Sequence, residues 1–421
     1  MTLHPERIAW SLAFVGFLAL FPGFVLYHLL VMGLHLPPLL AGFFGPVSAL
    51  LVLMYAPLQP KLLRSSNRAA QLFVLTVFLL LTFLLAWSVA HRALSPSPVV
   101  LEAFSQSWRA IILMGATFLV GLYLPLKSGL LHRLLLLVLG LGAAGLMGYY
   151  VFTGEPMFYA RAVFGSDSGA SYQGFARTAL VIAVLALILQ DSRPGRVAVG
   201  VCGLIAMWFL GARSEMIGFL VATLLYFGII GLRSRSIQVS AVVLVPVLAL
   251  LVSTNLDVID GSRHLQVLSL ADASSWQARV NMTETAVTQI RESPIIGVFG
   301  GHIAARGTSG AYAHNALSAW VSYGLLGFMG YVGLTLVATC HSLWKVVLQG
   351  DLRTRWVAAA VFGMVVLVLI IASKSVFWVL PSFAWGLYGN ALLLGSRSVT
   401  EPGLTFTDGP APSLRPTTPQ R

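Results

Sequence analysis

Apolar segments of about 17–25 residues recur along the whole of this 421-residue chain, and each is long enough to cross roughly 30 Å of hydrocarbon as a helix. Inside a bilayer the backbone must satisfy its own hydrogen bonds, so these segments are expected to be helical. The composition agrees, because 57% of the residues are hydrophobic and only 10% are charged. Soluble domains carry roughly 25% charged residues. We therefore expect an all-α integral membrane protein.

The apolar runs predict about twelve transmembrane helices of roughly 20 residues each. The expected spans are residues 8–35, 38–57, 69–90, 109–125, 130–152, 174–190, 195–210, 214–232, 237–253, 314–344, 356–379 and 381–396. They form one polytopic domain, residues 1–398, which contains one long loop at about residues 253–313. Residues 399–421 are rich in Pro, Thr and Ser, and we expect them to be a disordered cytoplasmic tail.

The distribution of Lys and Arg predicts how the spans are oriented. The formal net charge is +12, but no nucleic-acid-binding motif accompanies it, so we expect no nucleic-acid partner. In membrane proteins, basic residues concentrate in short cytoplasmic loops. With the N-terminus placed in the cytoplasm, every cytoplasmic segment holds at least one of the 26 basic residues, and together they hold the majority. We therefore expect both termini in the cytoplasm and the long loop on the outer (periplasmic or extracellular) side.

The long loop contains a predicted amphipathic helix at residues 274–294, with the sequence SSWQARVNMTETAVTQIRESP. Ser274 and Gln277 fit a capping box, and Pro294 ends the helix. Apolar residues recur at helical spacing, namely Trp276, Val280, Val287 and Ile290. Arg279 lies beside this apolar face and is a candidate for pointing into a cleft beneath the helix. The alternative is an arginine that faces solvent or lipid phosphates.

A second outer turn, GARSEMIGF at residues 211–219, places Arg213 and Glu215 in an otherwise apolar stretch. Ionisable residues at membrane depth are costly and usually mark a pathway or a site. The alternative is a local contact between Arg213 and Glu215 at the surface of a hairpin turn.

His314 opens one of the predicted spans, at the positive end of a helix dipole. This position disfavours the imidazolium form and keeps a neutral imidazole available as a base. Asn315 is a candidate for orienting the ring or for binding a sugar hydroxyl. The alternative is a helix N-cap at the membrane interface, and His264 and His302 in the same loop compete for any role.

A third outer segment, residues 154–180, places Arg161 and Arg177 among Gly, Ser and aromatic residues. This mixture suits contacts with sugar or phosphate, and it equally suits an ordinary re-entrant loop. The chain has no P-loop, no HExxH, no GxSxG and no DxD-type pair, so we expect no metal ion and no cofactor.

Charge counting alone places Arg213, Arg279 and His314 on the same side of the membrane. Arginine side chains match the oxygens of a diphosphate and stay charged at any relevant pH. A lipid diphosphate is a good leaving group once its developing charge is neutralised, and arginines can do this without a metal. A neutral histidine can accept the proton of an attacking sugar hydroxyl. The three residues together predict chemistry on an anionic, membrane-anchored substrate.

The order of these motifs resembles that of the O-antigen ligase and polymerase superfamily of bacterial membrane glycosyltransferases. That family has an Arg-Ser pair in a span, an Arg in the loop helix, a P-x-x-G-x-G turn, and His-Asn followed by xxGxxG. The matching residues here are Arg213, Ser214, Arg279, Pro294, Gly297, Gly300, His314, Asn315, Gly324 and Gly327. The turn departs from the pattern, because its second glycine is displaced by one residue. The likeness in topology covers residues 8–396, and the motifs cover mainly residues 211–330.

The resemblance implies an O-antigen ligase of the bacterial inner membrane, active at its periplasmic face in lipopolysaccharide biosynthesis. Such an enzyme transfers a glycan from undecaprenyl diphosphate to the lipid A-core oligosaccharide by inverting, metal-independent glycosyl transfer. On this interpretation Arg213 and Arg279 hold the donor diphosphate, and His314 is the base. Arg161 and Arg177 assist with phosphate or core-sugar charge.

Two alternatives remain open at this point. An O-antigen or other polysaccharide polymerase uses the same donor, and no residue separates it firmly from a ligase. A flippase or transporter of lipid-linked glycans needs polar residues at the membrane midplane. The mid-span segments here are almost free of them, which favours an enzyme.

Overall fold

The computed structural model describes residues 5–36, 44–60, 67–155, 157–158, 163, 172–231 and 274–395. All regular secondary structure in these ranges is helical, which confirms the expected all-α class. Every expected span that falls within them contains a helix, while the span expected at 237–253 lies outside the described residues. Among the described residues, seven helices are long and apolar enough to cross a membrane, so the expected count of about twelve is not confirmed.

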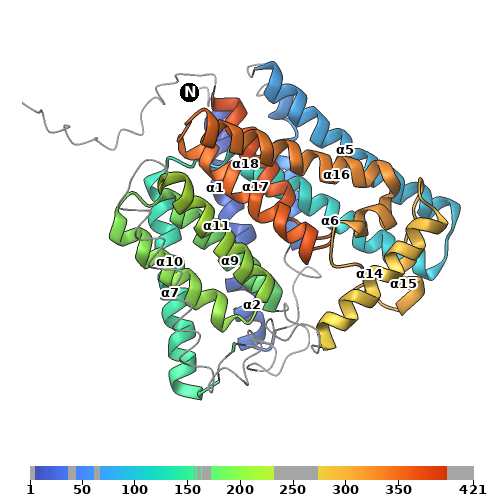
Figure 1. Cartoon of the computed structure of the whole chain (residues 1–421), viewed down its shortest axis with the longest axis horizontal. Coiled ribbons are helices and arrows are strands. Elements are labelled where there is room, and N and C mark those ends of the chain that lie inside the picture. Colours follow the sequence, from blue (N-terminus) through green and yellow to red (C-terminus); the bar gives the residue numbers. More distant parts are fainter. Residues whose placement is uncertain are drawn as a thin grey trace, which may run out of the picture.

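The helices follow one another with short connections over most of the described chain. Their order is α1 (Pro5–Leu18), η1 (Ala19–Gly23), α2 (Phe24–Gly33), α3 (Phe44–Tyr55), α5 (Arg68–Leu94), α6 (Pro98–Tyr123), α7 (Gly129–Thr153), α9 (Tyr172–Leu189), α10 (Arg193–Phe209), α11 (Arg213–Gly231), α14 (Ser274–Glu292), α15 (Gly301–Arg306), α16 (Leu317–Leu343), η4 (Trp344–Leu348), α17 (Thr354–Ala372) and α18 (Leu380–Gly395). The helices α7, α9, α10 and α11 form a group on one side of α17 and α18, and α5 and α16 lie on the other (Figure 1).

The centre of the bundle is the contact between α18 and α6. Gly121 and Gly386 lie against each other there, and a Cβ on Gly386 would come within 2.3 Å of the Phe118 carbonyl oxygen. The Thr117 and Ser382 hydroxyls are 2.7 Å apart across the same contact. Small residues let two helices approach closely, and this is how membrane helices gain packing energy without a hydrophobic effect between them. The helix α18 has only 16 residues, and protein rather than lipid surrounds it.

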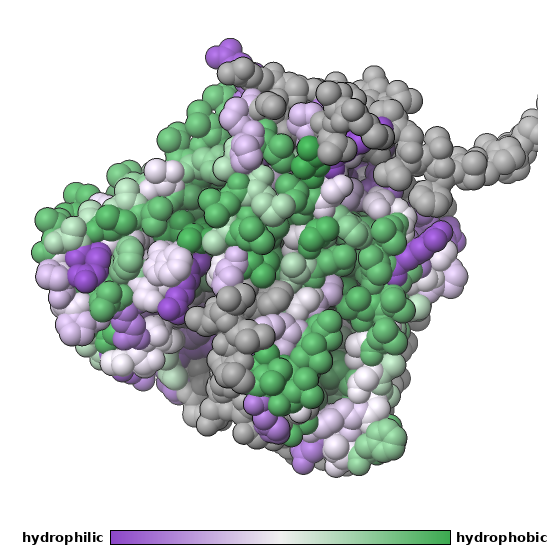
Figure 2. Space-filling model, turned by 180° about the vertical axis from the view of Figure 1, so that it is seen from behind, coloured by the Kyte–Doolittle hydropathy of each residue, from purple (hydrophilic) through white to green (hydrophobic). Residues whose placement is uncertain are grey.

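Large apolar side chains on the outer helices point away from the protein. The helices α5 and α7 carry several of them, including Leu72, Leu79, Leu137 and Leu141, all more than half exposed. Hydrophobic residues cover much of the face shown in Figure 2. A soluble protein rarely leaves so much contiguous apolar surface in water, so this surface is suited to contact with lipid.

The amphipathic helix expected in the long loop is present as α14, which ends two residues before Pro294. Its side chains Ala286 and Ile290 pack against Ala313 and Val321. The helix therefore rests on the start of α16, at the end of the bundle.

The chain after α14 makes a turn that inserts into a break in α16. Gly324 interrupts α16 with φ 68° and ψ −173°. The broken turn frees backbone groups, and the chain at Pro294–Val298 uses them: Val298 N–H donates to Val321 O (2.7 Å) and Leu325 N–H donates to Ile295 O (3.0 Å). A Cβ on Gly324 would lie 2.4 Å from that same Ile295 oxygen. The two glycine motifs therefore fit into each other, and they fix α14 relative to α16.

This interlock makes a prediction about stability. In Gly324→Ala, the new Cβ lies on a residue with positive φ and overlaps the Ile295 carbonyl oxygen. We therefore expect the variant to lose most of its folded protein in detergent extracts. Fluorescence-detected size-exclusion chromatography measures this directly. Gly333→Ala is the matched control in the same helix, because a Cβ there meets nothing within 4 Å. A Gly324→Ala variant as stable as Gly333→Ala would contradict the role of the break.

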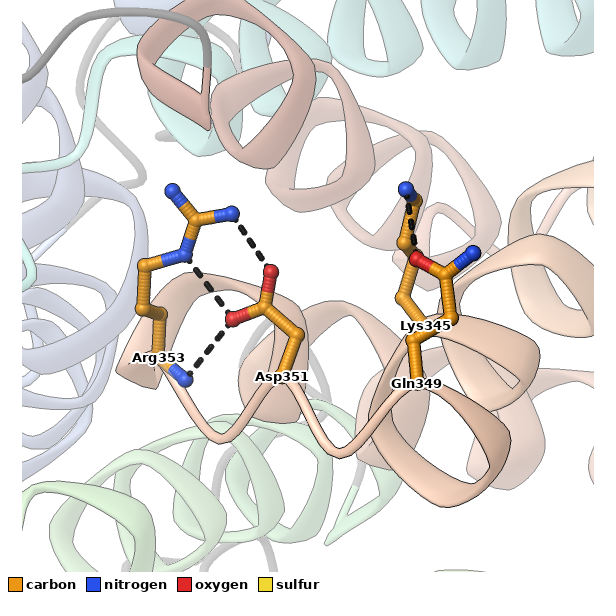
Figure 3. Close-up of polar contacts among 4 residues, drawn as sticks. All are labelled: Lys345, Gln349, Asp351 and Arg353. Atoms are coloured by element: carbon orange, nitrogen blue, oxygen red, sulfur yellow. Dashed lines mark hydrogen bonds and ion pairs between the residues drawn. The ribbon is translucent and has the colours of Figure 1, made fainter.

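The opposite end of α16 leads into a polar turn before α17. The Arg353 guanidinium donates to both carboxylate oxygens of Asp351, and Lys345 Nζ donates to Gln349 Oε1 at 2.9 Å (Figure 3). Basic residues of this kind were expected in the cytoplasmic loops. The turn lies at the far end of α16 from His314 and α14.

Candidate functional site

A cavity of about 260 Å³ lies at the end of the bundle. The helices α9, α11 and α14 meet there with the segment before α16 and the segment after α17. The lining of the cavity combines charged residues with aromatic rings. The lining residues that bear on chemistry are Arg177, Glu215, Arg279, Tyr312, His314, Ser373, Lys374, Phe377 and Trp378. The cavity is partly open, so it is accessible from outside the protein.

The structure brings together three of the residues expected from the sequence. His314 lies three residues before α16, Arg279 is in the first half of α14, and Arg177 is in the first half of α9. They come from segments far apart in the sequence and line the same cavity. Arg177 is held by the Phe24 ring, whose centroid is 5.7 Å from the guanidinium carbon.

Two other expected site residues do not line the cavity. Arg213 begins α11 and is half-buried, and it is not part of the cavity lining. Arg161 lies outside the described residues. Asn315 is next to His314 but does not line the cavity either.

Asn315 fixes the start of α16. Its Oδ1 accepts from Leu317 N–H (3.1 Å), and its Nδ2 donates to Thr283 Oγ1 on α14 (3.4 Å). The Thr283 hydroxyl in turn donates to the backbone oxygen of Arg279 (2.9 Å). The side chain therefore connects the segment that carries His314 to the helical turn that carries Arg279. An Asn side chain that accepts from the N–H two residues further on forms an Asx turn. The N-cap residue of α16 is Ala316, which makes no side-chain capping bond, so neither member of the His-Asn pair is the N-cap.

Burial and neighbouring cations keep the His314 imidazole neutral. The ring packs on Tyr312, with 5.1 Å between the ring centroids. Loss of hydration, followed by the positive charges of Arg279 and Lys374, lowers the pKa of His314 to about 4. From the sequence, a neutral ring was predicted because of the helix dipole. The structure shows two further causes, which are burial and the charges of Arg279 and Lys374. The neutral form is the one that can accept a proton.

The loop before His314 is held by α6. Gln106 Nε2 donates to Ser309 O (2.9 Å), and Ser309 N–H donates to Glu102 Oε1 (3.1 Å). The Gln106 Oε1 atom lies 3.2 Å from His302 Nε2. Burial lowers the pKa of His302 to about 4 as well. His302 lines a separate small cavity, so it supports the loop and does not compete with His314 for the main cavity.

Lys374 also lines the cavity, although no sequence motif singled it out. Lys374 lies two residues after the end of α17, and its Nζ forms a 2.5 Å ion pair with Glu215 Oε1 of α11. Both side chains are at least nine-tenths buried, and both line the cavity. The signal was present in the sequence, since a lone Lys in the apolar run IIASKSVFW is as costly as the Arg213–Glu215 interruption.

The cavity thus offers cations for an anion and a neutral base close to them. Within the described part of the chain, no three His, Cys, Asp or Glu side chains are grouped as metal ligands. No protein-family model matches the chain, and no curated protein matches it.

Proposed function

We propose that this protein is an O-antigen ligase of the bacterial inner membrane. It transfers a glycan from undecaprenyl diphosphate to a sugar hydroxyl of the lipid A-core oligosaccharide, with the cavity open to the periplasm. The proposal rests on the motif resemblance and on one observation, which is that His314, Arg279 and Arg177 line a single cavity.

The two arginines serve the leaving group. The resemblance pointed to Arg213 and Arg279 as diphosphate ligands, and in our proposal Arg177 takes the place of Arg213 because it lines the cavity. A guanidinium group donates two parallel hydrogen bonds to phosphate oxygens, and it loses little hydration energy when it does so. Fixed cations of this kind stabilise the charge that develops on the diphosphate as its bond to the sugar breaks.

His314 serves the acceptor. Its neutral imidazole accepts the proton of the acceptor hydroxyl while that oxygen attacks the anomeric carbon. The bond from the anomeric carbon to the diphosphate oxygen breaks on the opposite side, and its electron pair leaves with the diphosphate. One displacement inverts the anomeric configuration. The proton is then on His314, where the departing diphosphate stabilises it by charge.

The distribution of ionisable groups favours an enzyme over a flippase. Arg177, Glu215 and Lys374 lie near helix ends at the cavity, and Arg279 and His314 lie in the segment between α11 and α16. A flippase needs such groups along the whole path of the head group through the membrane. A polymerase that uses the same donor remains the second candidate, because the same cavity would serve it equally.

Gel electrophoresis of lipopolysaccharide from a strain that lacks the gene tests the proposal, together with analysis of the undecaprenyl-linked pool. A ligase predicts core without O-chain, and long glycan that stays on undecaprenyl diphosphate. A polymerase predicts core that carries a single repeat unit. Unchanged lipopolysaccharide and an unchanged lipid-linked pool would overturn both. Complementation with the unaltered gene is the control.

A further inference from the structure

We propose that Lys374 is a third ligand of the donor diphosphate. Glu215 holds Lys374 until the glycosyl bond breaks and then releases it to the diphosphate. This inference rests on the proposed function and adds to it a residue that neither the sequence motifs nor the resemblance identifies. The ion pair, its burial and the surrounding turn carry the argument.

The Glu215–Lys374 ion pair lies at the wall of the cavity. Glu215 and Lys374 are buried at the wall of the cavity that holds His314, and the two charged atoms are 2.5 Å apart. A buried ion pair contributes little to stability, because the loss of hydration offsets the attraction, and well-packed apolar residues usually do as well. An ion pair at the wall of an anion-binding cavity is therefore better explained by use than by stability.

Glu215 has interactions that do not involve Lys374. Ser214 Oγ donates to Glu215 Oε2 at 2.8 Å, on the oxygen that Lys374 does not use. The charge of Arg177 also acts on Glu215. The carboxylate lies in the first turn of α11, where the helix dipole favours a negative charge. Glu215 thus keeps partners without Lys374, so the exchange does not leave a bare buried charge.

Lys374 has a second partner on the cavity wall besides Glu215. It lies in the turn between α17 and α18, and its four-carbon stem places Nζ 5.6 Å from the Trp378 ring centroid. The attraction of the ring gives the ammonium a second partner along the cavity wall. In the same turn, Ser373 Oγ and Trp378 Nε1 have no hydrogen-bond partner among the described residues. These two donors flank Lys374 and lack an acceptor, so the turn can donate hydrogen bonds to an oxyanion.

The number of charges in the cavity fits the reaction. While Glu215 pairs with Lys374, it offsets one of the three cations Arg177, Arg279 and Lys374. Two cations remain for the two negative charges of a diphosphate diester. When the sugar–oxygen bond breaks, its electron pair adds a third negative charge to the leaving group. A cation that turns to the diphosphate at that moment stabilises the transition state more than the bound donor, and only such an interaction accelerates the step.

The test uses purified full-length protein in detergent, with farnesyl diphosphate as the binding probe and glycan transfer as the kinetic readout. For Lys374→Met, we expect kcat to fall about 100-fold and the Kd for farnesyl diphosphate, which carries the three negative charges of the leaving group, to rise about tenfold. For Glu215→Gln, which frees Lys374, we expect that Kd to fall about tenfold and kcat to fall as well, because the product is held. Lys374→Arg should restore part of kcat. Lys345→Met, at the opposite end of α16, is the matched control.

A purely structural ion pair predicts a different result. Both variants would then lower the melting temperature, leave the Kd for farnesyl diphosphate at its wild-type value and lower kcat no more than the control does. That outcome overturns this inference and leaves the proposed function intact. Wild-type protein that neither binds farnesyl diphosphate nor transfers glycan overturns the proposed function, and this inference falls with it.

Discussion

His314→Ala is expected to lower kcat for glycan transfer by about 10²–10⁴-fold, the range over which general bases act. The variant removes the neutral imidazole from the cavity but leaves Arg177 and Arg279 in place. We therefore expect the donor to bind as before, so the loss falls on kcat and not on KM. Assay of the purified variant with a lipid-linked glycan and core oligosaccharide measures both constants.

The control for this experiment is another histidine outside the cavity. His35 is exposed in the turn after α2 and adopts a φ of 50°, which Asn tolerates well. His35→Asn should therefore keep wild-type kcat and a wild-type elution profile. Full transfer by a correctly folded His314→Ala variant would remove His314 from the mechanism.

Arg279→Ala is expected to lower kcat/KM by about 10²–10³-fold, since it removes one fixed donor from the leaving group. Arg279→Lys keeps the charge but loses the paired geometry, so it should recover only part of this. Arg291→Ala is the matched control, because Arg291 lies in the last turn of the same helix and is exposed. Equal activity of the Arg279→Ala and Arg291→Ala variants would contradict the role of Arg279.

Arg279→Ala also makes a prediction about pH. Burial and then Arg279 lower the pKa of His314 from 6.5 to about 4, so the neutral base persists down to about pH 4 in the free enzyme. The kcat/KM of the wild type should therefore fall only as the pH drops through about 4. Without Arg279 the pKa of His314 rises, because imidazolium then meets less repulsion. The acidic limb of the pH profile should therefore shift to higher pH. An unshifted limb would contradict an electrostatic interaction between Arg279 and the His314 ring.

The candidate site could be predicted in part from local sequence. Arg279 and His314 were found because each is a polar residue beside an apolar pattern, and that signal needs no knowledge of neighbours. Asn315 and Arg213 were chosen by the same rule, yet neither lines the cavity. Local pattern shows that a polar residue is costly where it lies, but it does not show which way the side chain points.

Lys374 and the Gly324 break show the limit from the other direction. The partner of Lys374 is Glu215, which is 159 residues away in the chain, so nothing near Lys374 in the sequence indicates the pair. The break at Gly324 accepts the turn after Pro294, and no residue near either motif in the sequence indicates that the two meet. Contacts of this kind form when helices pack, and they depend on distances that a sequence does not contain.

The sequence by itself determined the all-α class, the apolar helices and the position of α14, because the need to satisfy the backbone in an apolar environment acts on every residue locally. The tertiary structure decided which helices are enclosed by protein, which arginine accompanies Arg279, and that Lys374 and Glu215 share a cavity with His314. These outcomes depend on the packing of helices distant in sequence, where small residues such as Gly121 and Gly386 set how closely two backbones approach.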